Sequence, residues 1–183
     1  MFSVRQSLIL ALVPAALAAQ QPAPAPAGPS ATPVLDAVRA QSARFGRNMP
    51  AAAEAMPADK YGFKPTPAQM SFGELVLHVA NSNNFLCSTA SGMAAPAKSA
   101  LTPASPHDSL VAAIRASFVY CDSALAKVDE SKLADQVPSF GGRMVSRFQA
   151  LLSLSMDWAD HYSQQAMYLR LNGLLPPTAR PRP

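Results

Sequence analysis

The longest helical pattern in this 183-residue chain is RMVSRFQALLSLSMDWADHYSQQAMYLRLN, residues 143–172. A helix of this length would extend over roughly 45 Å at 1.5 Å per residue, and Gly173 is placed to end it. Asp157 and His161 are four residues apart in this run, so they share one face of the helix, one turn apart. They belong to the line of residues that should face the core: Leu154, Asp157, His161, Gln164 and Tyr168. A polar pair therefore interrupts an otherwise core-facing stripe.

A first helix should begin at Thr32-Pro33, where a capping hydroxyl precedes a proline at the first helical position. Its apolar residues recur at steps of three and four: Val34, Leu35, Val38, Phe45 and Met49. Pro50 should bend or end this helix. The segment 57–69 is rich in proline and glycine, so we expect an ordered loop that packs Tyr61 and Phe63 against the helices.

Two more helices have clear boundaries. Ser71 and Glu74 match a capping box, so the second helix should begin there and end near Gly92. This role explains Glu74 completely, and we give it no catalytic one. The third helix should begin at Ser105-Pro106. No segment predicts a strand. The sequence therefore predicts an all-α fold, a four-helix bundle, which is an architecture that builds metal sites from inward-facing polar groups.

The ends of the chain have different compositions. Residues 1–19 have the pattern of a secretory signal peptide, with Arg5 before an apolar stretch and a small-x-small cleavage site at Ala16-Leu17-Ala18. This segment is too short to span a membrane as a helix, so we expect export to the periplasm or medium and no stable membrane insertion. The remainder divides into three parts: a Pro/Ala-rich linker (20–31), a helical domain (32–177) and a tail (178–183).

The charge of the chain excludes one class of partner. The formal net charge is +4, and because Arg5 is the only charged residue in 1–19, the mature chain would carry about +3. The basic residues are scattered without a run, so we expect no nucleic-acid partner. A small molecule is the expected substrate, and a homodimer is the expected assembly if the bundle has an apolar outer face.

Cys87 and Cys121 are the only cysteines. Export would take them to an oxidising compartment, where a disulfide can persist. Cys87 falls late in the second helix and Cys121 late in the third, so an antiparallel pair would not set them side by side. A bond between them then requires the two helices to be offset or crossed.

His78 lies in the second helix and could join Asp157 and His161 in a metal site. Imidazole and carboxylate are good ligands for divalent first-row metals, and three such ligands leave positions open for water or substrate. Coordination at about 2.1 Å requires ligating atoms roughly 4 Å apart or less. By spacing alone, Asp157 and His161 also fit a hydrogen bond on a helix surface.

Several stretches resemble a known family: Tyr61 to Pro67 (YGFKPTP), Ser71 to Ala80 (SFGELVLHVA), Asp160 to Gln164 (DHYSQ), and Tyr168 to Gly173 (YLRLNG) followed by Pro176-Pro177. Together they resemble the DinB-like, damage-inducible family of four-helix metalloenzymes over nearly all of 32–177. The resemblance implies a bundle with up-down-down-up helix directions.

In that family, one histidine on the second helix and a His-x-x-x-His pair on the last helix hold a divalent metal. His78 and His161 match the first and last of these ligands, whereas Asp157 stands where the family has its middle histidine. The resemblance implies zinc or nickel, with iron as an alternative. The aspartate implies a changed metal preference or loss of the metal.

Two functions follow from these expectations. The first is an exported metal-dependent hydrolase or transferase that uses His78, Asp157 and His161, with Gln164 orienting a water or substrate group nearby. The second is a non-catalytic exported binding module with a degenerate metal site. Relatives of this fold include thiol-dependent transferases and isomerases, but an exported protein would meet little reduced thiol, so we do not expect that activity.

Overall fold

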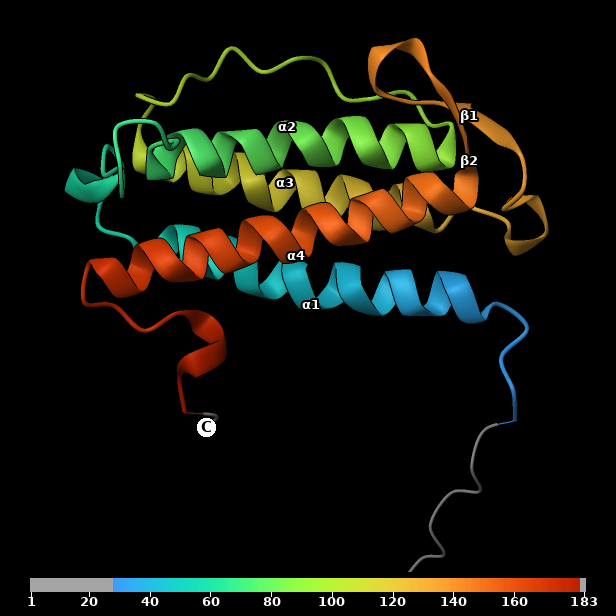
Figure 1. The fold of residues 1–183 in the computed structure, drawn as a ribbon, viewed down its shortest axis with the longest axis horizontal. Helices are drawn as coiled ribbons and strands as arrows, with labels where there is room; N and C mark the ends of the chain where they lie inside the picture. The colour runs from blue at the N-terminus through green and yellow to red at the C-terminus, as the bar shows by residue number, and fades with distance from the viewer. Residues whose placement is uncertain (1–27, 182–183) are drawn as a thin grey trace, which may run out of the picture.

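The computed structural model describes residues 28–181, so the predicted signal peptide and most of the predicted linker lie outside the described residues. Four long helices form the body of the molecule (Figure 1): α1 (Pro33–Ala55), α2 (Phe72–Ser91), α3 (His107–Leu125) and α4 (Arg147–Leu171). The shorter elements are an antiparallel pair of strands, β1 (Gln136–Pro138) and β2 (Met144–Ser146), and 3-10 turns at Ala58–Lys60, Glu130–Lys132, Phe140–Gly142 and Pro177–Ala179. The predicted all-α, four-helix fold is confirmed.

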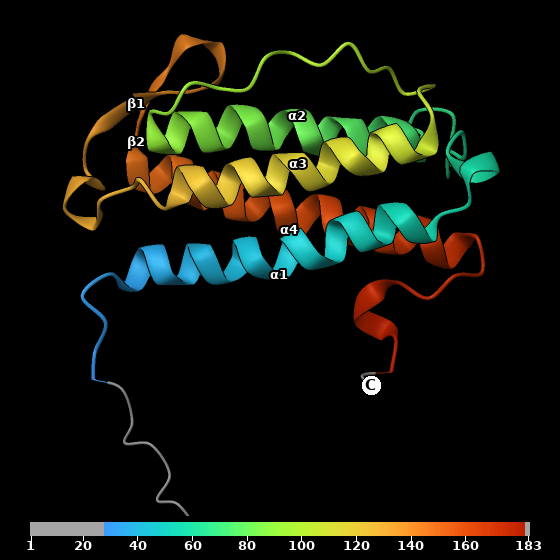
Figure 2. The ribbon, with the colours of Figure 1, turned by 180° about the vertical axis from the view of Figure 1, so that it is seen from behind.

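The helices pack so that each lies between two others: α1 and α2 both contact α3 and α4. Figures 1 and 2 show that α1 and α4 run in one direction and that α2 and α3 run in the other. The order is therefore up, down, down, up. Because α2 and α3 are parallel, the chain between them must return along the full length of the bundle, and residues 92–106 do so along the outside of α2 (Figure 1).

The parallel course of α2 and α3 explains the disulfide. Cys87 and Cys121 both come late in their helices, so parallel helices bring them to the same level of the bundle. The two residues are disulfide-bonded, with their Cα atoms 5.2 Å apart. The expectation that the bond needs offset or crossed helices was wrong because it assumed an antiparallel pair.

Both ends of α2 are fixed by local chemistry, as predicted. The Ser71 hydroxyl accepts a hydrogen bond from the Glu74 backbone N–H, and the Glu74 carboxylate accepts one from the Ser71 N–H. Gly92 ends the helix in the left-handed conformation, with φ of 78°. Near the start of α2, a Cβ at Gly73 would lie 2.7 Å from the Pro103 carbonyl oxygen, so the returning connection needs a glycine there to approach this closely.

The helix α1 and the loop after it lie where predicted, but the Thr32 hydroxyl makes no capping hydrogen bond to the helix backbone and donates to the Asp36 carboxylate at 3.1 Å. Pro50 is buried inside α1, which continues past it to Ala55, and Figure 2 shows the helix changing direction in its C-terminal part. In the loop, the Tyr61 hydroxyl donates to the Ala53 carbonyl at 2.7 Å, and the Phe63 ring packs edge-on against Tyr168 with centroids 6.0 Å apart. Both aromatic residues therefore join the bundle.

The start of α4 differs from the prediction. The helix begins at Arg147 and not at Arg143, because the residues just before it, 144–146, pair with residues 136–138 as β2 and β1. The Ser146 hydroxyl accepts from the Gln149 N–H and so caps α4. The expectation that the chain forms no strand was therefore wrong, although the ribbon has only three residues in each strand.

A polar network crosses the core. Trp158 is fully buried against the rings of Phe45 and Phe118. Its indole N–H donates to the Asn83 side-chain oxygen at 2.7 Å, and the Asn83 amide donates to the Ser117 hydroxyl at 2.9 Å. One residue of α2 therefore satisfies groups on both α4 and α3, and this fixes how the three helices meet.

The predicted tail is anchored where it begins. The Tyr162 hydroxyl donates to the Thr178 hydroxyl at 2.9 Å and accepts from the Thr178 backbone N–H at 3.1 Å. Within the part of the chain that the structure describes, no helix combines the length and the apolar composition needed to cross a membrane.

Candidate metal centre

The three predicted ligands come together at the seam between α2 and α4. These helices are antiparallel neighbours, and they bring His78 of α2 next to Asp157 and His161 of α4. The two imidazole rings have centroids 4.7 Å apart at an angle of 40°. One ligand atom from each of the three residues lies within 4.8 Å of the others. In residues 28–181, this is the one such convergence of three histidine, cysteine or carboxylate side chains.

Hydrogen bonds already orient the two histidines. Nδ1 of His161 lies 2.8 Å from the backbone oxygen of Asp157 and 3.4 Å from its Oδ1. A proton on Nδ1 donates to that carbonyl and leaves the lone pair of Nε2 free to act as a ligand. Nε2 of His78 lies 3.3 Å from the hydroxyl of Ser82, one turn further along α2.

The carboxylate of Asp157 provides a test of whether a cation fits. Its Oδ2 atom is buried and has no hydrogen-bond partner. A buried carboxylate oxygen without a partner is costly, and a cation between it and two imidazoles would remove that cost. Coordination at about 2.1 Å allows ligating atoms up to about 4.2 Å apart, so ligand atoms that lie within 4.8 Å of one another need to close by up to about 0.6 Å. The residues present therefore fit a divalent cation.

The surroundings shift the pKa values of the two histidines in opposite directions. Burial, and next the charge of His161, lower the pKa of His78. The hydrogen bond with the Asp157 side chain raises the pKa of His161, against the opposing effect of burial. His78 is thus biased toward the neutral form that can ligate, whereas His161 must first give up a proton that Asp157 stabilises.

The site opens to solvent on the outer side of α4. A hollow of about 480 Å³ lies there, lined by Ser153, Met156, Asp157, Asp160 and His161. Gln164, predicted to support the site, donates from its amide to the Asp160 carboxylate at 3.0 Å. Gln164 therefore hydrogen-bonds to Asp160 at the rim of the hollow and does not contact the three candidate ligands through this bond.

Sequence reasoning missed Ser82 and Asn83. Asn83 had a detectable signal, since an amide within an apolar helix needs a partner and the indole N–H of Trp158 needs an acceptor. Ser82 gave no signal beyond its four-residue spacing from His78. Trp158 and Tyr162 are buried in the core. The third histidine, His107, is partly buried and packs edge-on against Tyr61, with centroids 4.8 Å apart.

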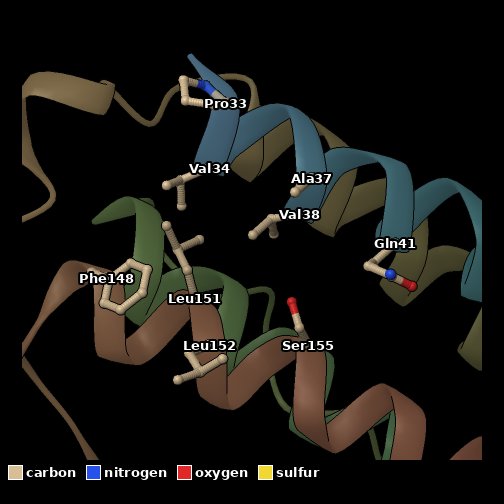
Figure 3. A pocket seen from close by; sticks show the side chains of 9 residues that line it. All are labelled: Pro33, Val34, Ala37, Val38, Gln41, Phe148, Leu151, Leu152 and Ser155. Atoms are coloured by element: carbon tan, nitrogen blue, oxygen red, sulfur yellow. The ribbon is translucent and has the colours of Figure 1, made fainter.

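A second hollow lies between α1 and α4, away from the triad (Figure 3). Its volume is about 370 Å³ and no charged residue lines it. Val34 and Val38 of α1 point toward Leu151 of α4 across the hollow (Figure 3). It has no metal-ligating side chain and is a separate, apolar surface feature.

Comparison with known proteins is consistent with this architecture. The sequence model described as the DinB superfamily matches residues 41–164. A DinB-like protein from Bacillus subtilis is 21% identical with a TM-score of 0.64, over 80% of this chain and 99% of that one. A DinB-like protein from Bacillus cereus is 14% identical with a TM-score of 0.66, over 78% of this chain and 95% of that one.

A variant of a mycothiol-dependent maleylpyruvate isomerase is also similar, with 16% identity and a TM-score of 0.56. The match covers 70% of this chain and 59% of the isomerase, so this chain spans less than two thirds of that protein. At these identities the solved structures share the fold alone. No curated protein matches the sequence.

Proposed function

This chain belongs to the DinB superfamily, and from that membership and its convergent triad we propose that it is an exported, divalent-metal-dependent hydrolase or transferase. His78, Asp157 and His161 hold the ion. The substrate is a small molecule that reaches the site through the hollow on α4. Zinc or nickel is the expected metal, and iron is the alternative, because a set of two imidazoles and one carboxylate suits each of them.

The observation that carries this proposal is the unpartnered Oδ2 atom of Asp157, buried beside two imidazoles. A protein gains nothing in stability from a buried carboxylate oxygen without a partner. The arrangement is understandable if the oxygen's partner is a cation that the same side chains bind.

The chain's own residues prepare the site for chemistry. A bound divalent ion would act as a Lewis acid and lower the pKa of a group that it binds. The backbone oxygen of Asp157 accepts a hydrogen bond from His161 Nδ1–H and so fixes the orientation of that ring. Asp160, held by Gln164, offers a carboxylate at the rim of the same hollow. It could accept a proton from an incoming substrate there.

The alternative is a non-catalytic binding module whose metal site is degenerate. The aspartate at position 157, where the resemblance implies histidine, favours this alternative. Metal content distinguishes the two functions, because a degenerate site would not bind the ion stoichiometrically.

Export is part of the proposal. Two features support it: the signal-like pattern of residues 1–19 and the bond between Cys87 and Cys121, which would persist in an oxidising compartment. Fractionation of expressing cells and N-terminal sequencing test it. A mature chain that begins at or next to Gln20 supports export, and an uncleaved chain in the cytoplasm contradicts it.

The function is tested by metal analysis of purified protein together with thermal unfolding. We expect about one equivalent of zinc or nickel per chain and a rise in the melting temperature when metal is added to metal-free protein. His78→Ala and His161→Ala should each abolish that rise. His107→Ala is the matched control and should retain it, since His107 lies on α3 against Tyr61. Absence of bound metal in the wild type, or an unchanged rise in His78→Ala, would overturn the proposal.

A further inference from the structure

Two exposed aromatic rings lie along the same seam as the triad. Phe85 of α2 and Phe140, in the turn between β1 and β2, have ring centroids 4.4 Å apart at an angle of 37°. Their exposed fractions are 37% and 54%, so the contact leaves much of both side chains open to solvent. Water-exposed aromatic surface of this kind often marks a site of contact with a ligand.

The position of Phe85 relates the pair to the metal centre. His78, Ser82 and Phe85 have the spacing i, i+4, i+7, so they form one line on α2. Phe85 is two turns beyond His78, roughly 10 Å along the helix axis. Because α4 runs antiparallel to α2, Ser153, one turn before Asp157, lies on the Phe85 side of the ligands and also lines the hollow. Small hydroxyl side chains therefore occupy the seam between the ligands and the aromatic pair.

Phe140 is not required to hold the β-ribbon against the helices. The ribbon is already fixed by the buried side chain of Val137 and by backbone hydrogen bonds at the start of α4, from Arg147 N–H to the Asp135 oxygen at 2.8 Å and from Phe148 N–H to the Leu133 oxygen at 2.9 Å. The exposed ring at the tip of the ribbon is thus free to serve another purpose.

We propose that Phe85 and Phe140 form an aromatic shelf that selects substrates with a flat, apolar tail. Such a substrate carries an oxygen or sulfur donor that binds the ion held by His78, Asp157 and His161, and a ring that stacks on the shelf about 10 Å away along α2. The inference rests on the proposed metal function and adds its substrate class, an aromatic or similarly flat compound with a metal-binding head group. Phe85 and Phe140 are specificity residues in this proposal and not ligands.

Two chelating probes with the same head group test the shelf. Butyrohydroxamate and 4-phenylbutyrohydroxamate, whose three-methylene spacer lets the ring reach the shelf, are titrated into the zinc- or nickel-loaded full-length mature protein by isothermal titration calorimetry. We expect 4-phenylbutyrohydroxamate to bind about tenfold more tightly, because only its ring can contact the shelf. Phe85→Ala and Phe140→Ala should each reduce this preference severalfold, while butyrohydroxamate affinity and metal content stay unchanged.

Two further variants separate the shelf from general effects. Phe85→Leu keeps an apolar side chain of similar size, so it should fold normally and still lose most of the preference for the ring. Phe148→Ala removes another exposed phenylalanine, which lines the apolar hollow of Figure 3. This variant should keep the full preference for the probe with the ring.

The outcomes distinguish the two proposals. Equal binding of both probes to metal-loaded wild type, or an undiminished preference in both Phe85→Leu and Phe140→Ala, overturns the shelf and leaves the metal function standing. A wild type that binds no metal overturns the proposed function, and the shelf fails with it.

Discussion

Asp157 stands one turn before His161 on α4, where the family resemblance implies a histidine. Its carboxylate lowers the stability of the metal-free protein but strengthens the binding of a metal ion. Without metal, a buried oxygen that lacks a partner lowers the stability of the fold. With metal, the same oxygen adds a charged ligand.

Asp157→Asn separates these consequences. At alkaline pH, where His161 is neutral and forms no ion pair, the substitution should leave the metal-free protein as stable as wild type or more stable. Metal affinity should fall by at least about tenfold, since even the loss of groups that only support a ligand costs about 10–100-fold. Thermal unfolding with and without metal measures both effects. A fall in metal-free stability combined with unchanged affinity would contradict the ligand role of Asp157.

Glu74 gives a pH dependence whose sign follows from its cap. Hydrogen bonds from the Ser71 backbone and hydroxyl, and next from Lys64, hold the pKa of the Glu74 carboxyl below its ordinary value. A carboxyl with a lowered folded-state pKa contributes stability above its unfolded pKa of about 4.3 and loses that contribution as the pH falls through the folded value.

Glu74→Gln should therefore lower the free energy of unfolding at neutral pH and have a smaller effect in acid, below both pKa values. Urea unfolding across this pH range measures the difference. Glu54→Gln serves as the control, because the exposed Glu54 pairs only with Arg115 on the surface and such pairs contribute little. An effect of Glu74→Gln that is equal at neutral and acid pH would exclude the charged cap as its cause.

At the scale of elements, Asn83 decides how three helices meet, since it bonds to Trp158 of α4 and Ser117 of α3 from its place on α2. Asn83→Ala leaves a buried indole N–H without its acceptor. We expect a loss of about 2–4 kcal/mol in the free energy of unfolding, measured by urea denaturation. Asn81→Ala, at an exposed position two residues earlier, should cost less than about 0.5 kcal/mol. Equal effects of the two substitutions would show that the network adds no stability.

Both boundaries of α2 followed from the sequence. Ser71 with Glu74 and Gly92 define α2 through bonds within one turn, so the residues themselves carry the information. The start of α4 did not follow, because residues 144–146 become a strand only through pairing with residues 136–138. Three residues are too few for periodicity to separate a strand from a helix.

At the scale of the whole molecule, one face of the bundle is apolar, and no other element within residues 28–181 covers it. Phe148, Leu152 and Met156 are 46%, 48% and 62% exposed and follow one another at four-residue steps on α4. Phe148 and Leu152 line the apolar hollow of Figure 3, whereas Met156 lines the hollow beside the candidate metal centre. This row of exposed side chains forms a ridge on α4 beside the hollow. In a homodimer, which the sequence led us to expect, the ridge of each copy could pack into the hollow of the other about a twofold axis.

Light scattering of the purified protein should therefore give about twice the monomer mass at micromolar concentration. Leu152→Glu should shift the protein to the monomer, because it sets a charge on the ridge. Val119→Glu is the matched control, since Val119 is 68% exposed on α3, which does not border this face. A monomeric wild type would show that the expected dimer is wrong.

The sequence by itself determined the four helices, the caps that bound α2 and the three residues of the candidate metal centre. Each of these depends on side chains within a few turns of one helix or on a resemblance carried by short motifs. Asp157 and His161 are an example, because helical spacing alone puts them on one face.

Only the tertiary structure decided which of these local features meet. The long return of residues 92–106 makes α2 and α3 parallel, and that direction brings Cys87 to Cys121. The antiparallel packing of α2 on α4 brings His78 to His161 and buries Oδ2 of Asp157 without a partner. These contacts join residues far apart in the chain, so they depend on how whole helices pack, which no spacing within a single helix specifies.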